Sequence, residues 1–184
     1  SLEEELRELA RRLKEEVRKL EETLEKVLED SARNIKRLID DLKRVNDELR
    51  KRVDDLIREV GDKETVDRMK KEIDDSSKEV EKLVRELEKE VDDLRKEHEK
   101  LVRDIRRKIK ELEDEIRDLE RKRIEKEALD RVRKKLEDAL KKLRDEVREM
   151  KKKNDKTNKE VKDKADELRK KHEDTLEELK KRVK

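Results

Sequence analysis

Apolar residues recur along this chain in steps of three and four residues, and the order of those steps predicts long helices. From Leu6 to Val60 the steps repeat as 3, 4, 4, 3 and 4, a block of 18 residues. Because an α-helix has ~3.6 residues per turn, such a block makes about five full turns and keeps one helix face apolar. This period lies between the heptad, which forces a left-handed supercoil, and the eleven-residue repeat, which forces a right-handed one. We therefore expect nearly straight helices.

Two further segments carry the same pattern. The stripe from Val66 to Leu119 has the same mean period, and the stripe from Leu129 to Val183 repeats the 18-residue block. Three apolar stripes of equal length predict an all-α fold, an antiparallel up-down-up three-helix bundle that forms one domain over residues 1–184. We expect its long helices at about 2–60, 63–120 and 126–183.

Local signals mark several of the expected helix ends. Gly61 follows the last position of the first stripe and is expected to take a left-handed conformation that ends the helix. Asp62 comes next and is expected to cap the second helix. At the start of the chain, Ser1 with Glu4 three residues later predicts a capping box.

The second break is inferred only from the phase of the apolar stripe. The ten residues from Leu119 to Leu129 turn an α-helix by about 1000°, which leaves the stripe roughly 80° out of register. Segment 121–128 contains no Gly, Pro, Asn, Asp or Ser, so its local propensity favours a helix. We favour a turn there. The alternative is an unbroken helix that opens the chain into a swapped dimer.

Composition limits the classes of function. Charged residues make up 63% of the chain, 59 basic residues nearly cancel 57 acidic ones, and there is no aromatic residue and no Cys. Since the two signs are interleaved and no aromatic side chain can stack on a base, nucleic-acid binding is not expected. No apolar run approaches the ~20 residues of a membrane span, and no targeting signal is recognisable. We expect a soluble, recombinantly expressed protein without a membrane partner, and its localisation is unknown.

A small set of polar residues interrupts the inward-facing stripes. These residues are Ser31, Ser77, His98, Asn154, Asn158 and His172. When the three segments are aligned as antiparallel hairpins, Ser31 is level with Asn154, while His98 and Asn158 lie in the layers on either side. This cluster is flanked by Asn34 and Thr157. Ser77 and His172 share another layer, flanked by Asn46, Ser76 and Thr175.

Serine beside histidine resembles a nucleophile and its base, but the sequence lacks the rest of such a site. There is no Gly-rich turn to expose a serine and no evident oxyanion hole, and the two histidines fall in distant layers with no second ligand nearby. We therefore predict no catalytic, cofactor-binding or metal-binding residue, no cofactor and no enzymatic activity. The polar residues are predicted to form a buried hydrogen-bond network, because an unpaired buried polar group costs about 1–3 kcal/mol.

The chain resembles de novo designed helical bundles built from parametric coiled-coil geometry with computed hydrogen-bond networks. The resemblance rests on the 18-residue repeat, the Ser, Asn and His layers, the Glu, Lys and Arg surface, and the short turn at Gly61 and Asp62. It covers the whole chain, although segment 121–128 lacks a designed-looking loop sequence and His is less usual in such networks. The resemblance implies an idealised, stable scaffold with no evolved substrate.

Two classes of function follow. The first is a structural scaffold, a monomeric bundle that requires no partner. The second is an interaction module whose apolar seam accepts another helix, through self-association, a designed partner helix or a switch between two states. The width of the seam favours the first, since a three-helix monomer needs about two inward positions in every seven and the sequence supplies nearly that number.

Overall fold

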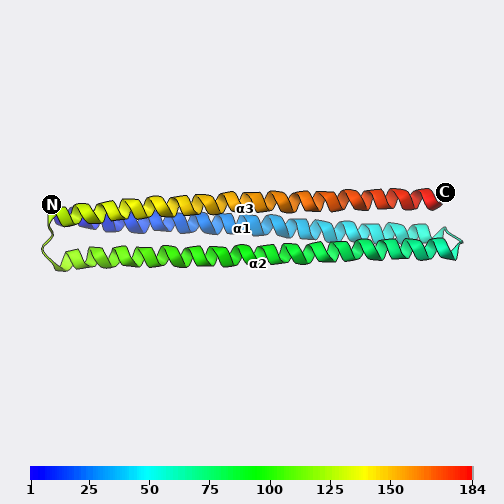
Figure 1. Ribbon diagram of the computed structural model, residues 1–184, viewed down its shortest axis with the longest axis horizontal. Coiled ribbons are helices and arrows are strands. Elements are labelled where there is room, and N and C mark those ends of the chain that lie inside the picture. Colours follow the sequence, from blue (N-terminus) through cyan, green and yellow to red (C-terminus); the bar gives the residue numbers. More distant parts are fainter. Residues whose placement is uncertain (184) are drawn as a thin grey trace. The chain divides into compact units, whose positions relative to one another are not determined.

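The computed structural model describes residues 1–183, without the side chain of Val183, so the predicted inward position of Val183 lies outside the described side chains. The chain forms three α-helices: α1 (Leu2–Arg58), α2 (Lys63–Arg121) and α3 (Lys126–Val183) (Figure 1). No strand occurs within residues 1–183. The predicted all-α class with three long helices is confirmed, and the helix ends agree with the predicted ones except at the ends of α1 and α2.

The chain divides into two compact units, and each contains part of all three helices. Unit 1 consists of Ser1–Asp30 and Leu94–Asp155. Unit 2 consists of Ser31–Asp93 and Lys156–Lys184. The single domain expected over residues 1–184 stays a prediction.

Ion pairs between helices define the helix directions within each unit. In unit 1 they join Glu5 with Arg133 (3.6 Å), Glu16 with Arg144 (2.9 Å), Glu115 with Lys135 (3.0 Å) and Glu97 with Lys153 (2.7 Å). Residue numbers rise together along α1 and α3, so these helices are parallel, and they change in opposite directions along α2 and α3. In unit 2 the antiparallel pairs are Glu79 with Lys171 (2.8 Å) and Glu72 with Arg182 (2.7 Å). The up-down-up arrangement of a three-helix bundle is confirmed.

The predicted apolar stripes form the core of each unit. In unit 1 the most deeply buried side chains are Leu6, Leu13, Leu24, Ile105, Leu129, Leu136, Leu140 and Leu143. In unit 2 they are Ile35, Leu42, Val53, Met69, Leu87 and Leu179. Full burial of one such side chain contributes about 1.5–3 kcal/mol. The regular spacing of these residues is therefore the main reason why the segments are helical and associated.

The connection between α1 and α2 differs from the predicted one at Gly61. No glycine in residues 1–183 has a positive φ, so the left-handed conformation predicted for Gly61 is wrong. Instead, the backbone N–H groups of Glu59 and Val60 donate to the carbonyl oxygens three residues earlier, both at 3.1 Å. This tighter turn ends the helix two residues before the predicted position, so no left-handed residue is needed to bond the last carbonyl groups.

The predicted caps at Asp62 and Ser1 are confirmed. Asp62 Oδ1 accepts from the backbone N–H of Glu64 at 3.2 Å, and Asp62 Oδ2 accepts from the hydroxyl of Thr65 at 2.8 Å. These hydrogen bonds, that of the Thr65 side chain first, hold the pKa of the exposed Asp62 carboxyl below its usual value. At the N-terminus of α1, Ser1 Oγ accepts from the backbone N–H of Glu4 at 3.3 Å.

The turn favoured for segment 121–128 is confirmed, and an unbroken helix through it is excluded. α2 ends at Arg121 and α3 begins at Lys126. Ile124, in the non-helical stretch between them, is half-buried and packs against the core of unit 1. Because this contact and the phase of the stripe both require the chain to turn, tertiary packing outweighs the local helix propensity.

Gly61→Ala tests the corrected turn. An added Cβ would meet no atom within 4 Å and the backbone needs no positive φ, so alanine fits without strain. We expect the variant to be more stable by about 0.4–1 kcal/mol in denaturant unfolding, because alanine restricts the unfolded chain. As a matched comparison, Asp62→Ala should lose stability, since it removes the cap of α2. A loss of stability in Gly61→Ala would contradict the corrected turn and would indicate that Gly61 has a left-handed conformation after all.

Candidate functional site

The candidate site consists of the polar residues that face inward. Five of them are almost fully buried, with exposed fractions of 3% for Ser31, 2% for Ser77, 3% for His98, 0% for Asn154 and 3% for His172. Asn158 and the flanking residue Thr157 are only half-buried. Asn34, expected to flank the same cluster, is exposed and belongs to the surface.

In unit 1, His98 of α2 forms a hydrogen bond with Asn154 of α3. Asn154 Nδ2 lies 3.1 Å from His98 Nε2, so in this geometry the amide donates to an unprotonated ring nitrogen. The predicted layers place these residues one layer apart. The bond still forms because helical side chains lean toward the N-terminus of their own helix, and on antiparallel helices the two lean toward one another.

In unit 2, Asn158 of α3 forms a hydrogen bond with Ser31 of α1. Asn158 Nδ2 donates to Ser31 Oγ at 3.3 Å. Here α1 and α3 are parallel, and the lean of Asn158 toward its own N-terminus brings its amide to the layer of Ser31. The predicted alignment of Ser31 with Asn154 joins residues of different units and stays a prediction.

The second predicted cluster also lies in unit 2 and includes a residue that sequence reasoning missed. Ser77 Oγ donates to Asn46 Oδ1 at 3.2 Å and accepts from Arg50 Nε at 2.9 Å. Arg50 also pairs with Asp74 at 3.7 Å. A signal for Arg50 existed, because it follows Asn46 by four residues and so lies on the same face of α1.

His172 is the least satisfied member of this cluster. Its Nε2 is buried and has no partner in the described protein, while the backbone of Ser76 acts on the other side of the ring only as an influence that raises the pKa of His172. Asn154 Oδ1 and Asn158 Oδ1 are likewise buried without a hydrogen-bond partner in the described protein. Residues 1–183 therefore contain buried hydrogen-bonded pairs with several unpaired atoms, and the predicted mutual satisfaction of all polar groups is incomplete. Each unpaired atom costs about 1–3 kcal/mol.

Burial controls the ionisation of both histidines. Desolvation lowers the pKa of His98, and the nearby Glu97 carboxylate opposes this shift only in part. Desolvation also lowers the pKa of His172, against the opposing effects of the Ser76 backbone and Glu79. Both rings are therefore predominantly neutral at pH 7.

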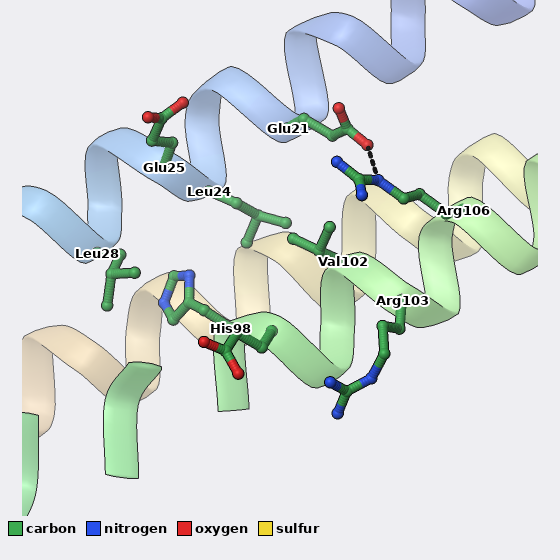
Figure 2. A pocket seen from close by; sticks show the side chains of 9 residues that line it. Glu21, Leu24, Glu25, Leu28, His98, Val102, Arg103 and Arg106 are labelled. Atoms are coloured by element: carbon green, nitrogen blue, oxygen red, sulfur yellow. Dashed lines mark hydrogen bonds and ion pairs between the residues drawn. The ribbon is translucent and has the colours of Figure 1, made fainter. Parts of the chain in front are cut away.

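A surface groove of about 400 Å³ lies beside His98 between α1 and α2 of unit 1. Figure 2 shows the His98 ring extending toward Leu28 of α1, with Leu24 and Val102 nearby. At its other end, Arg106 Nε pairs with Glu21 Oε1 at 3.4 Å. The groove thus joins an apolar floor to a charged rim and brings no nucleophile to His98.

The described residues carry neither a cluster of metal ligands nor a membrane-spanning helix. Within residues 1–183 no group of three or more His, Cys, Asp or Glu residues is placed to hold a metal ion. None of the described helices combines the length and apolar character needed to cross a membrane. His98 belongs to unit 1 and His172 to unit 2, so the two rings belong to separate polar clusters.

Acid should destabilise the protein through both histidines. Because their folded pKa values lie below the unfolded value of 6.5, the unfolded chain binds more protons as the pH falls through 6.5. The stability contribution is therefore present above this pH and is lost below it. Denaturant midpoints at pH 7 and pH 5 should differ more for this chain than for a variant with His98→Asn and His172→Asn. Equal acid losses in both proteins would exclude the histidines as the cause.

Protein-family models, curated proteins and solved structures yielded no match to this chain.

Proposed function

We propose that this chain is a structural scaffold of the de novo designed class, a monomeric helical bundle in which buried polar pairs fix the alignment of the helices. The observation that carries this proposal is that each buried pair joins two different helices. His98 bonds Asn154 between α2 and α3, and Ser31 bonds Asn158 between α1 and α3. The bond from Ser77 to Asn46 connects α2 with α1.

Such pairs supply what the apolar stripes lack. A stripe with a constant period offers nearly equivalent contacts when one helix slides along another by one step of three or four residues. A polar pair distinguishes these alignments, because sliding would bury a polar atom opposite an apolar side chain and cost about 1–3 kcal/mol. The pairs therefore favour one alignment at some expense of apolar burial.

The surface supports a chain that requires no partner. None of the large hydrophobic side chains described is exposed, and the outer faces carry ion pairs within and between helices. Exposed ion pairs contribute about 0–1 kcal/mol each, so they keep the surface polar more than they stabilise the fold. A contiguous apolar patch of the kind that marks a binding surface would need exposed Leu, Ile or Val residues.

The geometry does not favour catalysis as a competing function. The hydroxyl groups of Ser31 and Ser77 are bonded to asparagine side chains, and His98 uses Nε2 for Asn154. A serine nucleophile needs a base within hydrogen-bond reach, and these serines have asparagine amides and, at Ser77, the Arg50 guanidinium as partners instead. The same pairs that align the helices thus occupy the groups that catalysis would require.

Light scattering after size exclusion tests the monomeric scaffold. We expect a single species at the chain mass of 22.5 kDa over a wide range of protein concentrations, with no shift to larger species at the highest concentration. A concentration-dependent rise to twice this mass would contradict the proposal. It would favour instead the alternative of an oligomerising bundle that uses the same apolar seam.

A further inference from the structure

In unit 2 the unpaired buried atoms are concentrated on one helical segment. Asn158 Oδ1, Arg169 Nε and His172 Nε2 are buried without a partner in the described protein, and all three belong to the part of α3 from residue 156 to 183. Within the described part of unit 2, the segments from α1 and α2 have no such atom. Water would form hydrogen bonds with these three groups if the segment separated from the unit. These new hydrogen bonds would offset part of the free energy needed to release the segment.

The same segment buries less apolar side chain than its two neighbours. Its buried apolar residues are Val161, Ala165, Leu176 and Leu179. The α1 segment of unit 2 buries Ile35, Ile39, Leu42, Leu49 and Val53, and the α2 segment buries Met69, Ile73, Val80, Leu83, Val84 and Leu87. Along α3, no fully buried apolar residue lies between Val147 and Val161, so the helix has a weakly anchored stretch where release can end.

The polar contacts that hold this segment are weak. Arg169 pairs with Asp41 at 3.8 Å, and the Glu79–Lys171 and Glu72–Arg182 pairs join partly exposed side chains. Exposed ion pairs of this kind are largely screened and contribute little to stability. The Asn158–Ser31 bond satisfies only one side of the asparagine amide.

We propose that residues 156–183 form a releasable helix, and that the face of α1 and α2 they cover in unit 2 is a docking surface for a separate amphipathic helix. This occupant has the apolar spacing of α3 but carries apolar side chains at the positions of Asn158 and His172. The inference goes beyond the scaffold proposal, because a stable monomer can still open locally.

The covered face also specifies the charge of the occupant. Asp41 of α1 and Glu72 and Glu79 of α2 lie on its rim, where α3 now presents Arg169, Arg182 and Lys171. The occupant therefore carries basic residues at these three positions and lies parallel to α1. Its advantage over the resident segment comes from the two apolar replacements, since these remove the unpaired Asn158 Oδ1 and His172 Nε2. The Ser31 hydroxyl loses its bond from Asn158, but it can donate to the carbonyl group one turn earlier in its own helix.

Hydrogen exchange of the intact chain, followed by mass spectrometry, tests release. We expect interior amides of residues 156–183 to exchange at least about tenfold faster than those of residues 31–58 and 63–93 in the same unit, a ratio that corresponds to one unpaired polar group. Equal exchange in the three segments would show that unit 2 opens as a whole and would overturn the proposal. A full-length variant with Asn158→Leu and His172→Leu should lose the difference while staying helical by circular dichroism.

A synthetic peptide tests docking. The peptide has the sequence of residues 156–183 with Asn158→Leu and His172→Leu, and it should bind the intact chain and accelerate exchange in residues 156–183 of that chain alone. The unsubstituted peptide should bind at least about tenfold more weakly, since it keeps the two unpaired polar atoms of Asn158 and His172 and so has no advantage over the identical tethered segment. A third peptide that adds Val161→Asp and Leu179→Asp should not bind.

Failure of the leucine peptide to bind, or binding without faster exchange in residues 156–183, would overturn the proposal. Either result would leave the scaffold proposal intact, because the mass of the chain alone is measured separately. Conversely, a chain that proved dimeric by light scattering but still released this segment would contradict the monomeric scaffold and leave the releasable helix intact. The two proposals can therefore fail independently.

Discussion

Burial of three apolar stripes with a common period is the interaction on which the rest of this structure depends. Each fully buried Leu or Ile contributes about 1.5–3 kcal/mol, which exceeds what an exposed ion pair or a single hydrogen bond supplies. The stripe determines which residues are helical, where the helices end and which residues face inward. It leaves one quantity weakly determined, the position of each helix along its neighbours.

The buried polar pairs act on that quantity. They replace apolar side chains that would bury more surface, and they leave Asn154, Asn158 and His172 with unpaired atoms. A purely stabilising role is therefore a poor account of them, because fully apolar replacement of buried polar groups is often neutral or favourable. Their hydrogen bonds are directional and join different helices. The stability that these pairs cost is therefore accounted for by the selection of one alignment of the helices. Where the cost is highest, in the α3 segment of unit 2, the same physics provides a place where the bundle can open.

Much of the fold could be predicted because it follows from periodicity. The turn before Lys126 was predicted from phase although the local residues favour helix, and Ile124 explains why phase was the better signal. The left-handed conformation predicted for Gly61 is wrong for a local reason, since the last turn of α1 is tighter and needs no left-handed residue. A glycine in sequence permits that conformation but does not require it.

The sequence predicted which polar residues belong to the candidate site better than it predicted which hydrogen bonds they form. Inward positions identified Ser31, Ser77, His98, Asn154 and His172 as buried, because burial follows the same periodicity as the core. Individual partners depend on side-chain lean and length, which shift contacts by one layer. For this reason the Arg50 bond to Ser77 and the unpaired Nε2 of His172 were not predicted.

The central claim, that polar pairs select the alignment of the helices, can be measured as a distance in unit 1. The chain has no cysteine, so spin labels at Arg117→Cys on α2 and Lys152→Cys on α3 would be specific. Double electron–electron resonance should give one narrow distance distribution with His98 and Asn154 in place. With His98→Leu and Asn154→Leu, a second population should appear, displaced by about one helical turn of ~5.4 Å. A distribution that stays single and equally narrow in this variant would contradict the account, because the apolar stripes would then determine the alignment without the polar pair.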